Sequence, residues 1–256
     1  MASSDTLSIF VPAAGTTITQ TTTSGAKVTT SKFGDTLNTR VFPNDGKMID
    51  DVGIKEPTTG KTRTTFGGPS KDTSYIGNAD KNTVTYTGDA YSATIKTGGG
   101  DDKVVGNDFT NSTISLGGGD NSATTGGLFK TTLTSGSGAD SYTILGNSKD
   151  VKISSGSGDD SLIFGGKVND GTILLGKGAD YLDFSAKVTN TWIDLGNDSN
   201  VDEVVFNSKA DIGKGTAIFG SGENDLLIIG GEEYKFSEAK DAFISSIHPN
   251  DSIQFG

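Results

Sequence analysis

The amino-acid sequence predicts an all-β protein, a parallel β-solenoid of the β-roll type with about eight coils. Two patterns predict this fold. A glycine-rich turn recurs at near-constant spacing, and short runs of alternating apolar residues flank its copies. The composition agrees, because 37 of the 256 residues are glycine and only 32% are hydrophobic. So few apolar residues are typical of a narrow core rather than a thick globular one.

The glycine-rich turn occurs in seven copies. Counted from the first glycine, successive copies are separated by 19, 19, 20, 20, 20 and 24 residues. A fixed period of this kind indicates stacked repeats, in which each coil buries its apolar side chains against its neighbours. The seven turns are TGGGDD (97–102), LGGGDN (116–121), SGSGAD (135–140), SGSGDD (155–160), LGKGAD (175–180), LGNDSN (195–200) and FGSGEN (219–224).

Apolar and polar residues alternate on both sides of each turn. Leu162 and Phe164 follow one turn, and Leu182 and Phe184 follow the next at the same positions. Period-two alternation over about five residues predicts short, half-buried strands. One coil is therefore a strand, a polar corner, a second strand and a glycine-rich corner. Stacking coils about 4.8 Å apart places equivalent residues such as Leu162 and Leu182 in contact.

The repeat predicts three parts of the chain. Residues 61–231 form the solenoid, with the insertion NSKADIGKG (207–215) as a bulging corner loop. Residues 1–60 are rich in Ser and Thr and lack the Gly–Asp turns, so we expect an attachment arm or a small β unit. Residues 232–256 form a C-terminal cap, in which EEYKF is a last strand. Ser237 then N-caps a short helix, EAKDAFISSI.

The charge argues against several classes of partner and site. With 32 acidic and 21 basic residues, the net charge is −11, which opposes binding to nucleic acid or to anionic membranes. There is no cysteine and one histidine, which excludes zinc–thiolate and multi-histidine sites. No apolar run is long enough to span a membrane. The first residues, MASSDTLSIFVPAAG, do not resemble a secretory signal peptide.

Acidic side chains end most of the glycine-rich turns, and register places them in one row along the solenoid. Carboxylates about 5 Å apart repel each other by about 3 kcal/mol at an effective dielectric constant near 20. The row therefore predicts bound cations, and Ca²⁺ prefers carboxylate and carbonyl oxygens. The alternative is that these side chains cap their own turns by local hydrogen bonds. The residues are Asp102, Asn121, Asp140, Asp160, Asp180 and Asn224, with Asn200 or Asp202 in the irregular coil.

The segments GSGDDSLIF (156–164) and GKGADYLDF (176–184) resemble the RTX, or hemolysin-type calcium-binding, nonapeptide G-G-x-G-x-D-x-U-x. The resemblance covers about residues 95 to 230. It implies Ca²⁺ between successive turns. The ligands it implies are carbonyl oxygens near Gly156, Gly158, Gly176 and Gly178, together with Asp102, Asp140, Asp160 and Asp180.

The chain departs from the RTX pattern in two ways. Each coil has only one glycine-rich corner, so the resemblance implies at most one row of sites. The first glycine of the nonapeptide is replaced in every copy, by Thr97, Leu116, Ser135, Ser155, Leu175, Leu195 or Phe219.

Two outward-facing features remain open in function. Lys149, Lys167, Lys187 and Lys209 recur at the polar corner, either as a solvated basic edge or as a stripe that binds a partner. Trp192 is the only tryptophan, and the alternation places its side chain outside. It either stacks on a sugar or belongs to a packing interface.

These features favour a non-enzymatic structural or adhesive protein on an outer surface. Our first expectation is a phage virion component, a capsid decoration or fibre-like protein whose N-terminal arm joins a larger assembly. The alternative is a secreted, extracellular RTX-like surface or matrix protein, with cell-surface glycan as a possible ligand. A glycan-cleaving enzyme using Asp159 and Asp160 as acid and base is a weaker alternative. The outward threonines are too irregular to favour an ice-binding surface.

Overall fold

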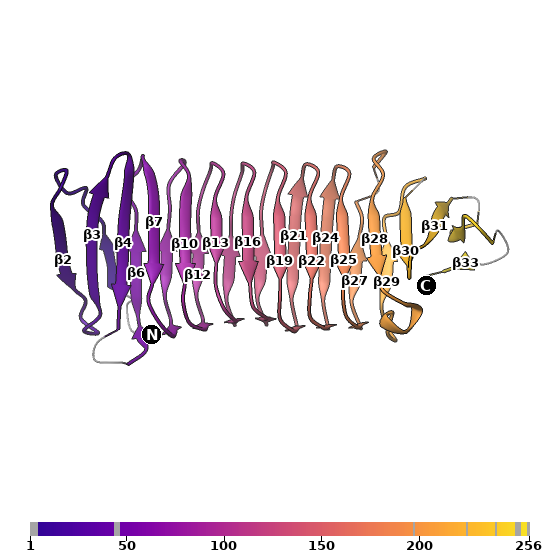
Figure 1. Cartoon of the computed structure of the whole chain (residues 1–256), viewed down its shortest axis with the longest axis horizontal. Coiled ribbons are helices and arrows are strands. Elements are labelled where there is room, and N and C mark those ends of the chain that lie inside the picture. The colour runs from indigo at the N-terminus through magenta and orange to yellow at the C-terminus, as the bar shows by residue number, and fades with distance from the viewer. Residues whose placement is uncertain are drawn as a thin grey trace.

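The computed structural model describes residues 5–43, 47–196, 198–223, 225–238, 240–248 and 252–254. It is an all-β parallel solenoid of about nine turns. Figure 1 shows the coils stacked along one axis, with the N-terminal strands at one end and the C-terminal strands at the other. This confirms the predicted fold class, and the number of coils is about one higher than expected. Within the described residues, no helix is long and apolar enough to cross a membrane.

Three sheets run along the solenoid. Sheet A has ten strands, in the order β1 (Asp5–Ser8), β6 (Val52–Lys55), β9 (Ser74–Ile76), β12 (Thr94–Lys96), β15 (Thr113–Ser115), β18 (Thr132–Thr134), β21 (Lys152–Ser157), β24 (Thr172–Lys177), β27 (Trp192–Asp194) and β29 (Ala217–Phe219). All neighbours in sheet A pair in parallel.

Sheet B has fifteen strands and is parallel between β4 and β30. Its order is β2 (Thr17–Thr21), β3 (Lys27–Phe33), β4 (Thr36–Phe42), β7 (Lys61–Phe66), β10 (Asn82–Tyr86), β13 (Lys103–Val105), β16 (Ser122–Thr125), β19 (Ser141–Ile144), β22 (Ser161–Phe164), β25 (Tyr181–Phe184), β28 (Glu203–Phe206), β30 (Leu226–Ile229), β31 (Glu232–Ser237), β32 (Ala242–Ser245) and β33 (Ser252–Ile253).

Sheet C consists of eight two-residue strands that lie inside what the sequence showed as one polar corner. They are β5 (Ile49–Asp50), β8 (Ser70–Lys71), β11 (Ala90–Tyr91), β14 (Phe109–Thr110), β17 (Leu128–Phe129), β20 (Ser148–Lys149), β23 (Val168–Asn169) and β26 (Val188–Thr189). A typical coil therefore contributes one strand to each sheet, in the order B, C, A.

The core is a set of columns that run parallel to the solenoid axis. Leu162 pairs directly with Leu182, as the 20-residue period predicts, and both side chains are fully buried. The rings of Phe164, Phe184 and Phe206 stack at centroid distances of 5.2 and 5.0 Å. Identical side chains in register thus fill the interior without any thick hydrophobic layer.

The N-terminal residues are continuous with the solenoid. Strands β4, β5 and β6 already form a complete coil before residue 61. Strands β2 and β3 extend sheet B as an antiparallel meander, and β1 adds one strand to sheet A. Residues 1–4 lie outside the described part of the chain.

The expected C-terminal helix is wrong. Residues Ala242–Ser245 form strand β32, which pairs antiparallel with β31, and β33 then pairs with β32. The turn before β32 places Asp241 at φ 49°, in the left-handed region that acidic residues tolerate. Phe243 is buried and its ring packs edge-on against that of the half-buried Phe236 on β31, a contact that favours pairing with sheet B over a helix. The insertion after β28 does bulge and contains the one-turn 3₁₀ helix η1 (Lys209–Asp211).

Candidate functional site

The glycine-rich corner requires glycine for two physical reasons. Gly156, Gly158, Gly176 and Gly178 have φ values of 107°, 127°, 105° and 126°, which side-chain-bearing residues rarely adopt. The corners of successive coils also approach closely. A Cβ on Gly176 would lie 2.0 Å from the carbonyl oxygen of Gly156. The predicted calcium-ligand glycines therefore lie together in one stacked corner.

The acidic side chains of these corners form one continuous hydrogen-bonded ladder. In each step, the Oδ1 atom of an Asp or Asn accepts the main-chain N–H of the equivalent residue one coil nearer the N-terminus. The donor–acceptor distances lie between 2.7 and 3.0 Å. The ladder runs through Asn82, Asp102, Asn121, Asp140, Asp160, Asp180, Asp202 and Asp225.

The ladder points into the solenoid. The sequence predicts a row of these side chains along one edge of the solenoid, and the structure places that row in the interior, with every member at most 2% exposed. The predicted residues Asp102, Asp140, Asp160 and Asp180 are thus brought together in one column, but inside the fold. Of the two candidates in the irregular coil, the ladder uses Asp202, and Asn200 is exposed. The predicted Asn224 lies outside the described residues, and Asp225 occupies the next position of the ladder.

The second carboxylate oxygen, Oδ2, differs along the ladder. In Asp102, Asp160 and Asp180 it is buried and has no hydrogen-bond partner. Asn121 shows what surrounds this position, because its amide nitrogen donates to the carbonyl oxygens of Gly119 at 2.8 Å and of Gly117 at 3.5 Å. By the shared register, we infer that the Oδ2 atoms of the aspartates face similar carbonyls. Such an arrangement is favourable only with a proton or a cation between the oxygens.

Burial raises the pKa of every aspartate in the ladder. Removal from water brings the pKa of Asp160 to about 6 and the pKa values of Asp180 and Asp202 to about 7. Hydrogen bonds from the main chain oppose this shift, and the neighbouring carboxylates add to it. Burial also raises the pKa values of Asp102, Asp140 and Asp225. The ladder therefore holds protons more tightly than exposed aspartates do.

Hydroxyl groups lie beside part of the ladder. Ser135 Oγ lies 2.6 Å from Asp140 Oδ2 and 2.5 Å from the main-chain oxygen of Ser155 in the next coil. The hydroxyls of Thr97 and Ser155, at the equivalent positions, donate to main-chain oxygens of the next coil. Asp180 and Asp202 have Leu175 and Leu195 at this position instead. The identity of the residue before the first glycine of each turn, Thr, Ser or Leu, is the sequence signal for these differences.

The donor set limits how a metal ion could be held. Across the described ranges, no group of three or more His, Cys, Asp or Glu side chains is arranged to hold a metal ion. A Ca²⁺ ion would be held by unpartnered Oδ2 atoms, such as those of Asp160 and Asp180, together with glycine carbonyls. The ion would balance the negative charge of these buried oxygens. Oxygen-only ligation of this kind suits Ca²⁺.

A second ordered column, which the sequence analysis missed, follows sheet C. One residue in each coil there has positive φ, and most of these residues are Asp or Asn, which tolerate that conformation. Their spacing of about 20 residues was the signal that could have revealed this corner. The residues are Asp51, Asp72, Ser92, Asn111, Lys130, Asp150, Asp170 and Asn190.

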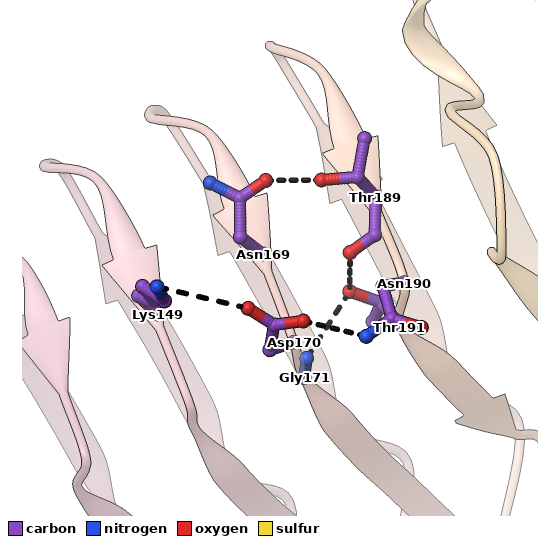
Figure 2. A network of polar contacts seen from close by, with 7 residues as sticks. All are labelled: Lys149, Asn169, Asp170, Gly171, Thr189, Asn190 and Thr191. Atoms are coloured by element: carbon purple, nitrogen blue, oxygen red, sulfur yellow. Dashed lines mark hydrogen bonds and ion pairs between the residues drawn. The ribbon is translucent and has the colours of Figure 1, made fainter.

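Figure 2 shows that polar side chains connect the coils at this second corner. Asn190 donates to Asp170 at 2.5 Å, and Lys149 lies 4.0 Å from the same carboxylate. Thr189 donates to Asn169, and the hydroxyl of Thr191 accepts the N–H of Gly171 at 3.3 Å. These contacts account for one of the four recurring lysines, Lys149, as part of a solvent-exposed structural network.

A further buried carboxyl group lies in the first coils. Glu56 is 4% exposed, and burial raises its pKa to about 7. Its Oε1 atom accepts the hydroxyl of Thr64, whereas Oε2 has no partner. Nearby, Tyr75 shares hydrogen bonds with Thr62 and Asn82, which begins the ladder. The first coils thus have a partly polar interior.

Comparisons with known proteins add no relative. No family model matches the chain, and neither a curated protein nor a solved structure shows significant similarity to it.

Proposed function

We propose that this protein is a non-enzymatic structural rod of an outer surface, and that its setting is a phage particle, as a capsid decoration or fibre-like protein. The observation that carries the proposal is the unbroken stacking of the coils. Sheets A and B and the buried ladder continue from coil to coil, so main-chain hydrogen bonds link the molecule along its whole length. Such a construction resists bending and displays a long surface.

The N-terminal end is the proposed attachment point. Phe33, at the tip between β3 and β4, is 85% exposed, and Phe10, between β1 and β2, is 67% exposed. Large apolar side chains at one end of a rod favour a protein partner there. The partner we propose is another component of the same assembly.

The glycan-cleaving alternative receives less support from the acidic corner. Asp160 points into the solenoid, whereas Asp159 is exposed and accepts the main-chain N–H of Ala179 at 2.9 Å. The two carboxyl groups therefore do not face one common space, as an acid–base pair requires.

Mass spectrometry tests the setting. Virus particles purified on a density gradient from the source lysate are expected to contain the chain at a constant ratio to the major capsid protein. Its presence in the cell-free medium of uninfected cells, and its absence from purified particles, would instead support the secreted surface or matrix protein. Gene neighbourhood gives a second test, because the secreted alternative expects an adjacent type I exporter.

Calcium binding is the second proposal, and the unpartnered Oδ2 atoms favour it. Ligand binding to the folded state alone raises the thermal midpoint by mass action. We expect a higher midpoint in millimolar Ca²⁺ than in EGTA, and a smaller difference for the double variant D160N/D180N. Mg²⁺ at equal concentration is the control for ionic strength. Equal midpoints in Ca²⁺ and EGTA would remove calcium and leave the rod proposal intact.

A further inference from the structure

The C-terminal end of the solenoid is asymmetric. Sheet A ends at β29, whereas sheet B continues beyond the same coil through β30, β31, β32 and β33. Figure 1 shows these last strands extending past β29. Sheet A therefore has no strand opposite the last four strands of sheet B.

Strand β29 has an unpaired edge. The N–H of Ala217 donates to Thr191 and the carbonyl of Phe219 accepts from Leu195, so both residues bond toward β27. In a parallel ladder, the residue between them points its N–H and C=O to the opposite side. That residue is Ile218, which is 5% exposed and whose main-chain groups have no partner in the described part of the chain. Buried main-chain groups without partners are costly and uncommon.

A groove opens beside this edge. It has a volume of about 380 Å³ and lies between β29 and the final meander. Apolar side chains from both sides line it, with one carboxylate and one hydroxyl at its wall. The lining includes Ile218, Phe219, Ser221, Phe236, Asp241 and Ile253.

An apolar patch continues from the groove across the outer face of sheet A. Trp192 is 62% exposed, and its ring lies 4.8 Å from the ring of Phe219, which also lines the groove. Leu174, on the neighbouring strand β24, is 42% exposed. Tryptophan in such a patch is typical of binding hot spots between proteins.

The charge around this end is strongly negative. From Phe219 to the last residue, the sequence has seven acidic residues and two lysines. Asp194 is exposed beside the patch, between Leu174 and Phe219 in register. A partner of positive charge is therefore favoured here.

We propose that β29 and its groove bind an extended strand of a partner protein, one that alternates apolar residues with Lys or Arg. The strand adds in parallel as the next rung of sheet A and pairs with the free N–H and C=O of Ile218. One set of its side chains enters the groove toward Phe236 and Ile253. The other set lies beside Trp192 and Phe219. Strand addition to an open sheet edge is a general mode of peptide recognition.

A second copy of the chain fits this edge less well. Two-fold pairing of β29 with itself would bring two acidic ends together. The N-terminal strand β1 already occupies a close-fitting place on β6, where Gly53 leaves room for Thr6. The complementary charge and the free edge thus favour a separate, basic partner.

A synthetic peptide tests the proposal. The probe is a blocked octapeptide of alternating valine and lysine, and the fluorescence of Trp192, the only tryptophan, reports binding. We expect saturable binding of one peptide for each chain. The valine–glutamate peptide is expected to bind about tenfold more weakly. A valine–lysine peptide N-methylated at alternate residues cannot pair with a sheet edge and is expected not to bind.

Two variants of the chain locate the site. Ile218→Pro removes the N–H that points away from β27, at a position where an edge strand tolerates proline, and it also replaces a buried isoleucine side chain. It is expected to weaken peptide binding about tenfold and to lower the thermal midpoint through the lost burial, so binding is measured well below that midpoint. Asp241→Asn keeps a residue that tolerates φ 49° and removes the carboxylate of the groove. It is expected to weaken the valine–lysine peptide about threefold. The control is Leu145→Ala, an exposed leucine on another part of the surface.

Three results would overturn the proposal. The first is no binding of the valine–lysine peptide, and the second is equal binding of its N-methylated form. The third is a dimer of the free protein that Ile218→Pro dissociates, measured by sedimentation, because a second copy would then occupy the edge. Should Ile218→Pro fail to fold, the N-methylated peptide and Asp241→Asn still decide the question.

Discussion

Glycine has two separable roles in the corners of this solenoid, and two residues distinguish them. Gly60 and Gly176 have nearly the same φ, 101° and 105°. A Cβ on Gly60 would meet no atom within 4 Å, whereas a Cβ on Gly176 would lie 2.0 Å from the carbonyl oxygen of Gly156. Position 60 needs glycine for its backbone conformation alone, whereas position 176 also needs it for the close stacking of coils.

We therefore expect the substitutions G60A and G176A to differ sharply. G60A should lower the free energy of unfolding by about 1 kcal/mol, the cost of an alanine in the left-handed region. G176A should lower it by about 3 kcal/mol or more, because the main chains of two coils must separate. Urea unfolding measures both, and equal losses would contradict the importance of close stacking.

At the same scale, Asp180 is expected to be replaceable by asparagine with a gain in stability. Asn121 shows that an amide fits the ladder, since its nitrogen donates to glycine carbonyls while its oxygen accepts an N–H. In metal-free buffer at pH 8, D180N should raise the free energy of unfolding by about 1 kcal/mol. At pH 5 the gain should be smaller, because Asp180, with a pKa of about 7, is then protonated and can itself donate. The exposed D159N is the control, and a lower stability of D180N at pH 8 would contradict the prediction.

At the scale of elements, the buried ladder predicts how stability depends on pH. The folded-state pKa values of Asp160, Asp180 and Asp202 are about 6, 7 and 7, above the ordinary value near 4 that they have when unfolded. Between these limits the folded state binds more protons than the unfolded state. Its stability must therefore fall as pH rises. The contribution of these groups is complete below about pH 4 and lost above about pH 7.

Thermal unfolding in EGTA at several pH values between 5 and 8 measures this dependence. The midpoint is expected to fall as pH rises, and the triple variant D160N/D180N/D202N should show a flatter profile. A midpoint that rises with pH in the natural chain would show that the ladder is ionised without cost. EGTA matters, because a bound cation would mask the effect.

The strands and their register were predictable because the same repeating residue pattern determines both. Alternation gives the strand, and the 20-residue period gives the neighbour, as the pairing of Leu162 with Leu182 shows. The direction of the aspartate side chains was not predictable in the same way. Solvation alone would place Asp160 outside, and only the N–H of Asp140, supplied by the preceding coil, makes its burial possible.

The C-terminal cap shows a second limit of the sequence. Ser237 followed by EAKDAF has the residues of a helix start, and local propensity therefore favoured a helix. Pairing with the exposed edge of β31 gives Ala242–Ser245 a strand conformation instead. The open edge of a sheet is a property of the whole fold, and no local pattern reports it.

For the whole molecule, periodicity predicts which deletions the chain tolerates. Removing residues 161–180 joins Asp160 to Tyr181 and deletes one full coil, so every buried column stays in register. We expect this variant to fold, with a shorter rod and a modest loss of stability. Removing residues 161–170 deletes half a coil and places the sheet A residues of β24 where sheet B belongs. Circular dichroism and small-angle scattering distinguish the two outcomes, and a folded half-coil deletion would contradict the stacking model.

The ladder has a direction, and that direction bears on biosynthesis. Each N–H waits for an acceptor that lies about 20 residues further along the chain, from Asn82 to Asp202. The series ends at Asp225, whose own N–H donates to the carbonyl oxygen of Gly222 within the same turn at 3.2 Å. A polypeptide still emerging from the ribosome, or one cut short by a premature stop codon, therefore always ends in a coil whose donor is unmet. Such fragments would expose an unpaired main-chain N–H in their last coil, which makes that coil easier for quality-control proteases to unfold and cleave. In the full chain this donor is paired.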